Sequence, residues 1–159
     1  MNLTLTTPQR MFGALLPLSL LTFSPSALAQ EETCTPLSVV GSPSQTEVSK
    51  KVSLPSFLVT NTNWNTDFAV PSDASYSRFL VTITPTLGTN YDLAVNLKYS
   101  DDTVDGVYQE DGVTLPLTEP YVIEAPARTG ETPYQVNILV GGPDSVENEY
   151  TASVMGCVD

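Results

Sequence analysis

Carboxylate side chains are concentrated in one short segment near the middle of the chain. The segment begins with Asp101-Asp102-Thr103-Val104-Asp105-Gly106 and continues to Glu110-Asp111-Gly112. Calcium takes roughly six to eight oxygen ligands, and spaced Asp residues before a glycine are typical of its binding loops. Gly112 stands where an EF-hand would need Glu, so the spacing is not that of an EF-hand. Calcium is the one cofactor that the sequence suggests, and the residues that would hold it are Asp101, Asp102, Asp105, Glu110 and Asp111.

Two other interpretations of the acidic residues stay open. The segment is also consistent with a solvated hairpin whose charges keep a sheet edge from pairing with other chains. A second, thinner calcium candidate is formed by Asp67 and Asp73, which flank the Val70-Pro71 turn. The sequence does not decide among these alternatives.

The single tryptophan lies in a polar, turn-prone stretch, between Asn63 and Asn65. An aromatic face can stack on the apolar face of a sugar while amides bond to its hydroxyls. Trp64, Asn63 and Asn65 are therefore the candidate ligand-binding residues. The competing interpretation places Trp64 inward, as a cap on the core, because a lone tryptophan in a small domain is highly buried on average.

Residue types needed for nucleophilic or acid–base catalysis are largely missing. The chain has no His, which excludes Ser-His and Cys-His pairs. A Ser-Lys pair needs a buried neutral lysine, whereas Lys50, Lys51 and Lys98 fall on the polar faces of predicted strands. No glycine-rich phosphate loop occurs, and carboxylate pairs arise by chance in so acidic a chain. We expect no enzymatic activity.

The two cysteines, Cys34 and Cys157, stand near the two ends of the expected mature chain. Two cysteines without a histidine are too few for a structural zinc site. In an oxidising compartment, an even pair of this kind predicts a disulfide. Such a bridge would tie the first strand to the last.

Alternating apolar and polar residues predict the elements that must position these side chains. The clearest stretches are residues 78–84, 91–99, 134–140 and 150–155, and weaker ones are 48–54, 57–60, 66–70 and 121–125. Turn-forming residues separate them, and no helical periodicity follows residue 29. The pattern predicts a single antiparallel β-sandwich, jelly-roll-like, with about seven to nine strands. We expect it to span residues 47–159, after an approach segment at 30–46.

Residues 1–29 have the pattern of a cleavable signal peptide. Arg10 precedes an apolar run at residues 11–21, and Ala27-Leu28-Ala29 forms a small-x-small cleavage site. The run is shorter than the about 20 residues that span a bilayer, although an N-terminal anchor helix is the competing interpretation. We expect a secreted or periplasmic protein that is not inserted in the membrane after cleavage.

The charge balance is strongly acidic, with 18 Asp and Glu against 6 Lys and Arg and a net charge of −12. Removal of residues 1–29 takes away only Arg10, which leaves −13. A field of this sign repels nucleic acid and anionic membranes. High solubility is the simplest consequence of the charge.

From about Glu47 to Met155 the chain resembles the bacterial pre-peptidase C-terminal domain, a jelly-roll-like sandwich appended to many secreted peptidases. The resemblance rests on short motifs: Asn65-Thr66-Asp67-Phe68-Ala69-Val70-Pro71, where the family has an Asp-x-Phe-type strand and a Val-Pro turn, Asp92-Leu93-Ala94-Val95, Tyr134-Gln135-Val136 after Gly130, and a closing Tyr150-Thr151 strand. Two extra residues between Gly130 and Tyr134 depart from the family pattern. The resemblance implies the fold and an accessory role in secretion or in binding a matrix or polysaccharide.

Three classes of function follow from these observations. The first is an exported, non-catalytic module that binds an extracellular glycan, matrix or protein surface. The second is a structural or calcium-stabilised envelope protein. The third is a partner or inhibitor of a secreted peptidase, which is suggested because the family that the chain resembles is appended to such peptidases. The oligomeric state is not indicated by the sequence.

Overall fold

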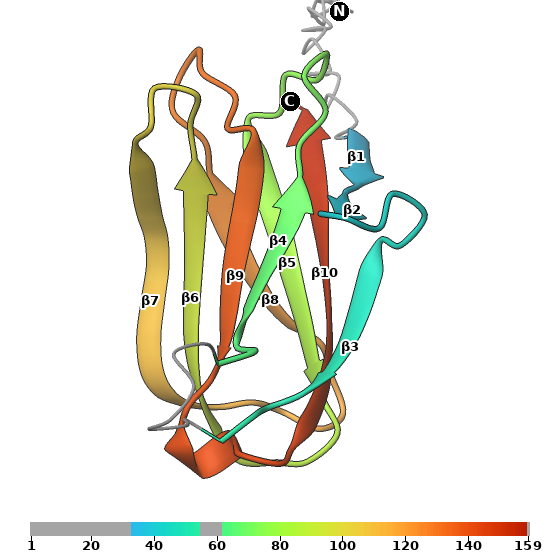
Figure 1. Cartoon of the computed structure of the whole chain (residues 1–159), viewed down its shortest axis with the longest axis vertical. Coiled ribbons are helices and arrows are strands. Elements are labelled where there is room, and N and C mark those ends of the chain that lie inside the picture. The colour runs from blue at the N-terminus through green and yellow to red at the C-terminus, as the bar shows by residue number, and fades with distance from the viewer. Residues whose placement is uncertain (1–32, 55–61, 159) are drawn as a thin grey trace, which may run out of the picture.

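The computed structural model describes residues 33–54 and 62–158 of the chain. The expected signal peptide at 1–29 and the predicted strand at 57–60 lie outside these residues. The described part forms ten strands in two antiparallel sheets that pack face to face (Figure 1), which confirms the predicted sandwich. No helix in the described ranges is long and apolar enough to cross a bilayer.

The first sheet, sheet A, has the strand order β1-β10-β5-β8, and β3 also pairs with β10. Its strands are β1 (Thr33–Pro36), β3 (Glu47–Lys51), β5 (Arg78–Pro85), β8 (Tyr121–Pro126) and β10 (Glu149–Val158). Strands β1 and β3 therefore pair with different parts of the same edge of the long β10, and β5 pairs with its other edge.

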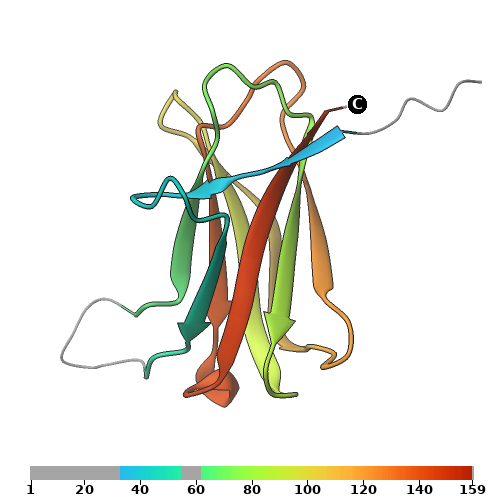
Figure 2. The ribbon, with the colours of Figure 1, turned by 90° about the vertical axis from the view of Figure 1, so that its right-hand side faces the viewer.

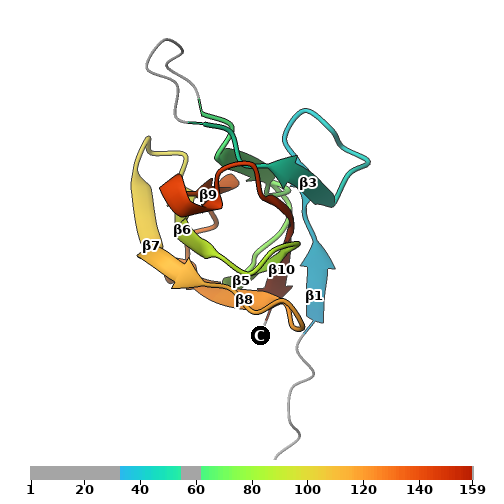
Figure 3. The same ribbon diagram turned by 90° about the horizontal axis from the view of Figure 1, so that it is seen from below.

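The second sheet, sheet B, has the order β2-β4-β9-β6-β7. Its strands are β2 (Ser38–Val39), β4 (Asn65–Ala69), β6 (Asn90–Lys98), β7 (Val104–Thr114) and β9 (Gln135–Gly141). A short 3-10 turn, η1 (Pro143–Ser145), joins β9 to β10. Seen from below, the two sheets enclose the core between them (Figure 3).

The core is built from the alternating residues that predicted the strands. On β6, Tyr91, Leu93, Val95 and Leu97 are buried, and their polar neighbours point outward. The same alternation on β5 buries every second residue from Phe79 to Ile83. Because side chains alternate between the faces of a strand, one set fills the sandwich and the other meets water.

Strand β7 covers most of the carboxylate-rich segment, for which the sequence left open a calcium-binding loop or a hairpin at a sheet edge. It is the edge strand of sheet B, and two irregularities in its pairing with β6 shift the register. Much of β7 is exposed, including Val104. The usual apolar alternation is therefore absent from its sequence, because an edge strand buries little of either face.

Strands β1 and β2 lie in the expected approach segment and join both sheets. β1 pairs with β10 of sheet A, and β2 pairs with β4 of sheet B. Between them the buried Leu37 donates its backbone N–H to Val154. Figure 2 shows this segment crossing one end of the sandwich. The sandwich in the described chain thus begins at β1.

A disulfide joins β1 to β10 and confirms the predicted bridge. Cys34 and Cys157 are 123 residues apart in sequence, lie opposite each other in the ladder and have an S–S distance of 2.05 Å. The bridge fixes the first described strand to the last.

Side-chain hydrogen bonds connect the sheets at both sides of the sandwich. At one side, the hydroxyls of Tyr108 on β7 and Tyr121 on β8 are 2.9 Å apart. At the other, Lys50 Nζ on β3 donates to the backbone oxygens of Asn63 and Asn65 at 3.1 and 2.7 Å. Lys50 was expected on the polar face of its strand. It lies instead on the face that meets the core, because its neighbour across the ladder is the buried Tyr150. Desolvation lowers the pKa of Lys50.

Candidate functional site

Three connections meet at one end of the sandwich, which we call the loop end. They are the β4–β5 loop at residues 70–77, the β6–β7 loop at 99–103 and the β8–β9 loop at 127–134. All three lie at the upper end of the molecule in Figure 1. Loops carried by a rigid sandwich are common places for binding residues.

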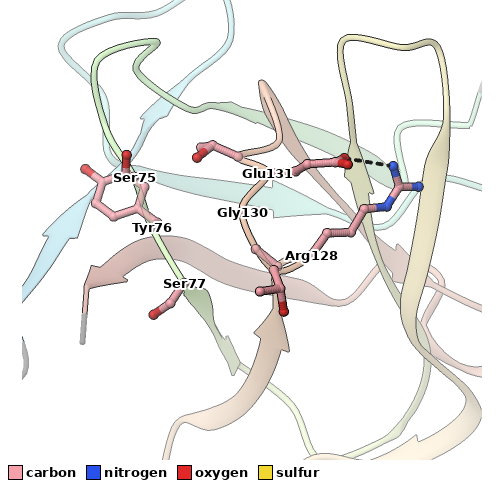
Figure 4. A pocket seen from close by; sticks show the side chains of 9 residues that line it. Ser75, Tyr76, Ser77, Arg128, Gly130 and Glu131 are labelled. Carbon is pink, nitrogen blue, oxygen red and sulfur yellow. Dashed lines mark hydrogen bonds and ion pairs between the residues drawn. The ribbon is translucent and has the colours of Figure 1, made fainter.

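A pocket of about 470 Å³ opens between the first and the third of these loops (Figure 4). Ser75, Tyr76 and Ser77 form the wall on the β4–β5 side. The opposite wall is formed by residues 127–132 of the β8–β9 loop. The volume lies within the range of about 300–1,000 Å³ that is usual for small-ligand sites. This pocket, which we call the loop-end pocket, is the candidate functional site.

The wall at Tyr76 is held by packing against the core. The Tyr76 and Phe79 rings meet edge to face, with centroids 5.9 Å apart. Gly156 on β10 also lies against the Tyr76 ring, where a Cβ would overlap ring atoms. Ser77 is tied to the same strand, because its backbone N–H donates to Cys157 O at 2.9 Å. This wall is therefore anchored to β10, the strand that the disulfide links to β1.

The opposite wall is held by Arg128. Its guanidinium donates to both oxygens of Asp105, each at 2.7 Å, and to Glu131 at 3.2 Å. Asp101 lies 3.6 Å from the same group, and the guanidinium stacks 4.0 Å from the centre of the Tyr99 ring. We call this arrangement the Arg128 clamp. It joins the β8–β9 loop to β7 and to the β6–β7 loop.

The clamp also sets the protonation of its members. The paired carboxylates raise the pKa of Arg128, with Asp105 as the main cause. Hydrogen bonding from Arg128 lowers the pKa of Asp105. The pKa of Asp101 is lowered chiefly by hydrogen bonds from Thr103. All of these groups therefore stay charged at neutral pH, and the positive charge of Arg128 is offset by its neighbours.

Several hydroxyl groups of the pocket are free to bind a ligand. Among the described residues, the side-chain oxygens of Ser75, Tyr76, Thr129 and Thr132 bond to no other protein group. Ser77 differs, because its hydroxyl donates to Cys157 O at 3.3 Å. Hydroxyls both donate and accept hydrogen bonds, so this set can bind the donor groups and the acceptor groups of a polar ligand.

The structure separates the five residues expected to bind calcium. Asp101 and Asp105 face Arg128, and Asp102 is exposed in the turn between β6 and β7 with a φ of 65°. Glu110 and Asp111 lie further along β7, where Glu110 is opposite Leu93. Across residues 33–54 and 62–158, no three His, Cys, Asp or Glu side chains are grouped to hold a metal. Calcium binding stays a prediction.

The second calcium candidate, Asp67 and Asp73, is not assembled as a pair either: Asp67 bonds to neighbouring side chains and Asp73 is exposed. Asp67 Oδ1 on β4 accepts from Lys98 Nζ at 3.2 Å and from Asn137 Nδ2 at 2.8 Å. Asn96 in turn donates to Asn137 Oδ1 at 3.2 Å. These side chains form a polar row across the outer face of sheet B, whereas Asp73 is exposed in the β4–β5 loop.

Trp64 and its two asparagines lie at the opposite end of the sandwich from the pocket. Trp64 is partly buried against the core, its Nε1 donates to Ser53 O at 2.9 Å, and its ring covers Gly141. Asn63 donates to Lys51 O at 2.7 Å and accepts from Ser53 N at 2.9 Å. This geometry agrees with the inward interpretation of Trp64. Sugar binding at these residues stays a prediction.

The residues of the loop-end pocket were not singled out from the sequence. The only signal was a concentration of Ser and Thr in two loops, residues 70–77 and 127–134, and such loops are common in any β protein. Arg128 was equally inconspicuous, although it is one of only six basic residues in the chain. The meeting of the loops depends on the order of the strands.

Comparison of the chain with models of protein families, with curated proteins and with solved structures finds no match. The resemblance to the pre-peptidase C-terminal domain therefore rests on the short motifs alone and stays a prediction.

Proposed function

We propose that the protein is an exported, non-catalytic binding module that takes an extracytoplasmic partner, a glycan, a matrix polymer or a protein surface, at its loop end. The observation that carries the proposal is the pocket of about 470 Å³ between two loops that are both held to the sandwich. A held pocket loses little conformational entropy when it binds, and this favours affinity.

The chemistry of the pocket supports binding without catalysis. Of its described lining residues, Tyr76, Arg128 and Glu131 carry titratable side chains. Arg128 and Glu131 are paired with each other at 3.2 Å. A general acid or base needs a pKa near the working pH, whereas the clamp moves the pKa of Arg128 upward.

Export is supported by the cysteines and by the charge. The Cys34–Cys157 disulfide is typical of proteins that fold in oxidising compartments. The high negative charge disfavours nucleic acids and anionic membranes as partners. These features agree with the signal-like pattern of residues 1–29.

The experiment is a binding screen with a matched pair of variants. The wild-type protein is tested against immobilised polysaccharides and extracytoplasmic proteins, secreted peptidases among them. Thr129→Trp fills the pocket from its wall, and Thr118→Trp places the same ring in an exposed loop at the far end. We expect a partner whose binding weakens at least tenfold in Thr129→Trp and is unchanged in Thr118→Trp.

Two results would overturn the proposal. One is a partner that binds equally well to both tryptophan variants, because its site would lie away from the loop end. The other is chemical conversion of a bound partner, detected by mass spectrometry after prolonged incubation, because the module would then be catalytic.

A further inference from the structure

We infer that the ligand of the loop-end pocket is an uncharged saccharide unit bound through its hydroxyl groups. This inference rests on the proposed function, since it names the chemical class that the same site would take. It is carried by the free hydroxyls, the charge balance and the apolar wall of the pocket.

The free hydroxyls come from both walls of the pocket. Ser75 and Tyr76 contribute from the β4–β5 loop, and Thr129 and Thr132 contribute from the β8–β9 loop. Each can donate and accept a hydrogen bond. A sugar likewise presents neighbouring hydroxyls that both donate and accept, so the two sets are complementary. Figure 4 shows residues 75–77 and the β8–β9 loop on opposite sides of the pocket.

The charges around the pocket disfavour ionic ligands. The guanidinium of Arg128 is already bonded to Asp105 and Glu131 and stacked on Tyr99. It therefore has little capacity left for a phosphate, sulfate or uronate group. Glu131 is paired with the same guanidinium through Oε2 at 3.2 Å, so part of its charge is already compensated. An uncharged, hydroxyl-rich ligand fits these conditions better than an ion of either sign.

The pocket also has an apolar part. The Tyr76 ring and Ala127 line it beside the hydroxyls. The C–H face of a pyranose can pack on such a surface while its hydroxyls bond to the polar groups. Tyr76 is only 9% exposed and is packed on Phe79 and Gly156, so its position does not depend on the ligand.

The test is an NMR titration of the isotope-labelled protein with defined sugars. The probes are the methyl glycosides of glucose, galactose, mannose and N-acetylglucosamine, with glucuronate and glucosamine as charged counterparts. We expect at least one uncharged sugar to shift the amide signals of residues 75–77 and 127–132 in a saturable way. We expect the charged counterparts to bind at least tenfold more weakly.

Two variants then assign the contacts. Thr129→Val with Thr132→Val removes two free hydroxyls at nearly constant shape, and Thr118→Val is the matched control in a distant loop. We expect the double variant to bind the sugar at least tenfold more weakly with an unchanged melting temperature. Tyr76→Phe keeps the ring and is expected to retain part of the affinity.

The inference is overturned if no uncharged sugar shifts these amides, if a charged counterpart binds more tightly, or if the double variant binds like the control. A partner from the screen that is lost in Thr129→Trp while no sugar binds would refute the saccharide class and leave the binding module intact. A pocket-filling variant that keeps every partner would refute both.

Discussion

The carboxylate of Asp105 on β7 accepts two hydrogen bonds of 2.7 Å from the guanidinium of Arg128 in the β8–β9 loop. Two parallel bonds between planar groups fix orientation as well as distance. The most acidic segment of the chain therefore has a structural partner, and the pair holds one wall of the loop-end pocket.

Replacing Arg128 by Lys should loosen the loop end while leaving the fold in place. Lysine keeps the charge but cannot form the paired bonds to Asp105 or stack in the same way on Tyr99. We expect faster amide hydrogen exchange at residues 99–103 and 127–134, with no change in the centres of β5 and β10. Asp105→Asn should have a similar effect, and the double variant should add little to either single one. Fully additive effects would show that the two residues act separately.

Tyr150 makes stability depend on pH in the alkaline range. Burial raises the pKa of Tyr150 from 10.0 to about 12. As pH rises, the unfolded chain therefore loses this proton before the folded protein does. The contribution of Tyr150 to the free energy of unfolding is complete below pH 10 and is lost as pH rises toward 12. At about 1.4 kcal/mol per pKa unit, the loss is of the order of 2–3 kcal/mol. Urea unfolding at a series of pH values measures it.

Tyr150→Phe should remove most of this pH dependence between pH 10 and 12. Burial also raises the pKa of Tyr91 and of Tyr108, so part of the alkaline loss will remain. Tyr134→Phe, at a half-exposed side chain, is the control and should leave the profile unchanged. A Tyr150→Phe profile equal to that of the wild type would contradict the assignment.

Gly141 is expected to tolerate no side chain. A Cβ at this position would overlap the Trp64 ring, and forcing extra atoms into a packed site costs roughly 1–3 kcal/mol. At Gly88 a Cβ would meet Leu117 at an ordinary 3.5 Å. Thermal melts should therefore show Gly141→Ala destabilised well beyond Gly88→Ala. Equal melting temperatures would mean that Trp64 moves aside freely.

Loss of the disulfide should lower stability strongly. The bridge closes a loop between residues 123 apart, for which the chain-entropy model gives roughly 4–5 kcal/mol as an upper value. Urea unfolding of the double variant Cys34→Ala, Cys157→Ala against the oxidised wild type measures the difference. Thiol alkylation of the native protein followed by mass analysis checks that the wild type carries the bridge. An unchanged midpoint would show that β1 contributes little to cooperative folding.

Calcium binding at the acidic segment predicts a higher melting temperature in millimolar calcium than in EDTA, because a ligand of the folded state stabilises it. Arg128 occupies two of the carboxylates concerned, Asp101 and Asp105. Arg128→Gln should therefore increase the calcium-dependent shift. Identical melts in both conditions, for the wild type and for Arg128→Gln, would exclude a calcium site in this segment.

Much of the fold could be predicted from the chain because its signals are local. The alternation at residues 78–84 and 91–99 appears as β5 and β6 with small changes at the ends. The edge strand β7 and the sheet-joining β1 and β2 could not be predicted in this way. Their side chains are mostly exposed or half-buried, so their conformation depends on partner strands.

The sequence by itself determined the all-β class, the period of the core residues and the pairing of the two cysteines. Tertiary structure alone decided which strands are neighbours, and hence which loops meet. Ser75 and Thr132 line one pocket because β5 pairs with β8 and β4 pairs with β9, which brings two distant loops to the same end. The contact between Arg128 and Asp105 likewise depends on the order of the strands. Such contacts follow from strand order and register, which no local pattern of residues specifies.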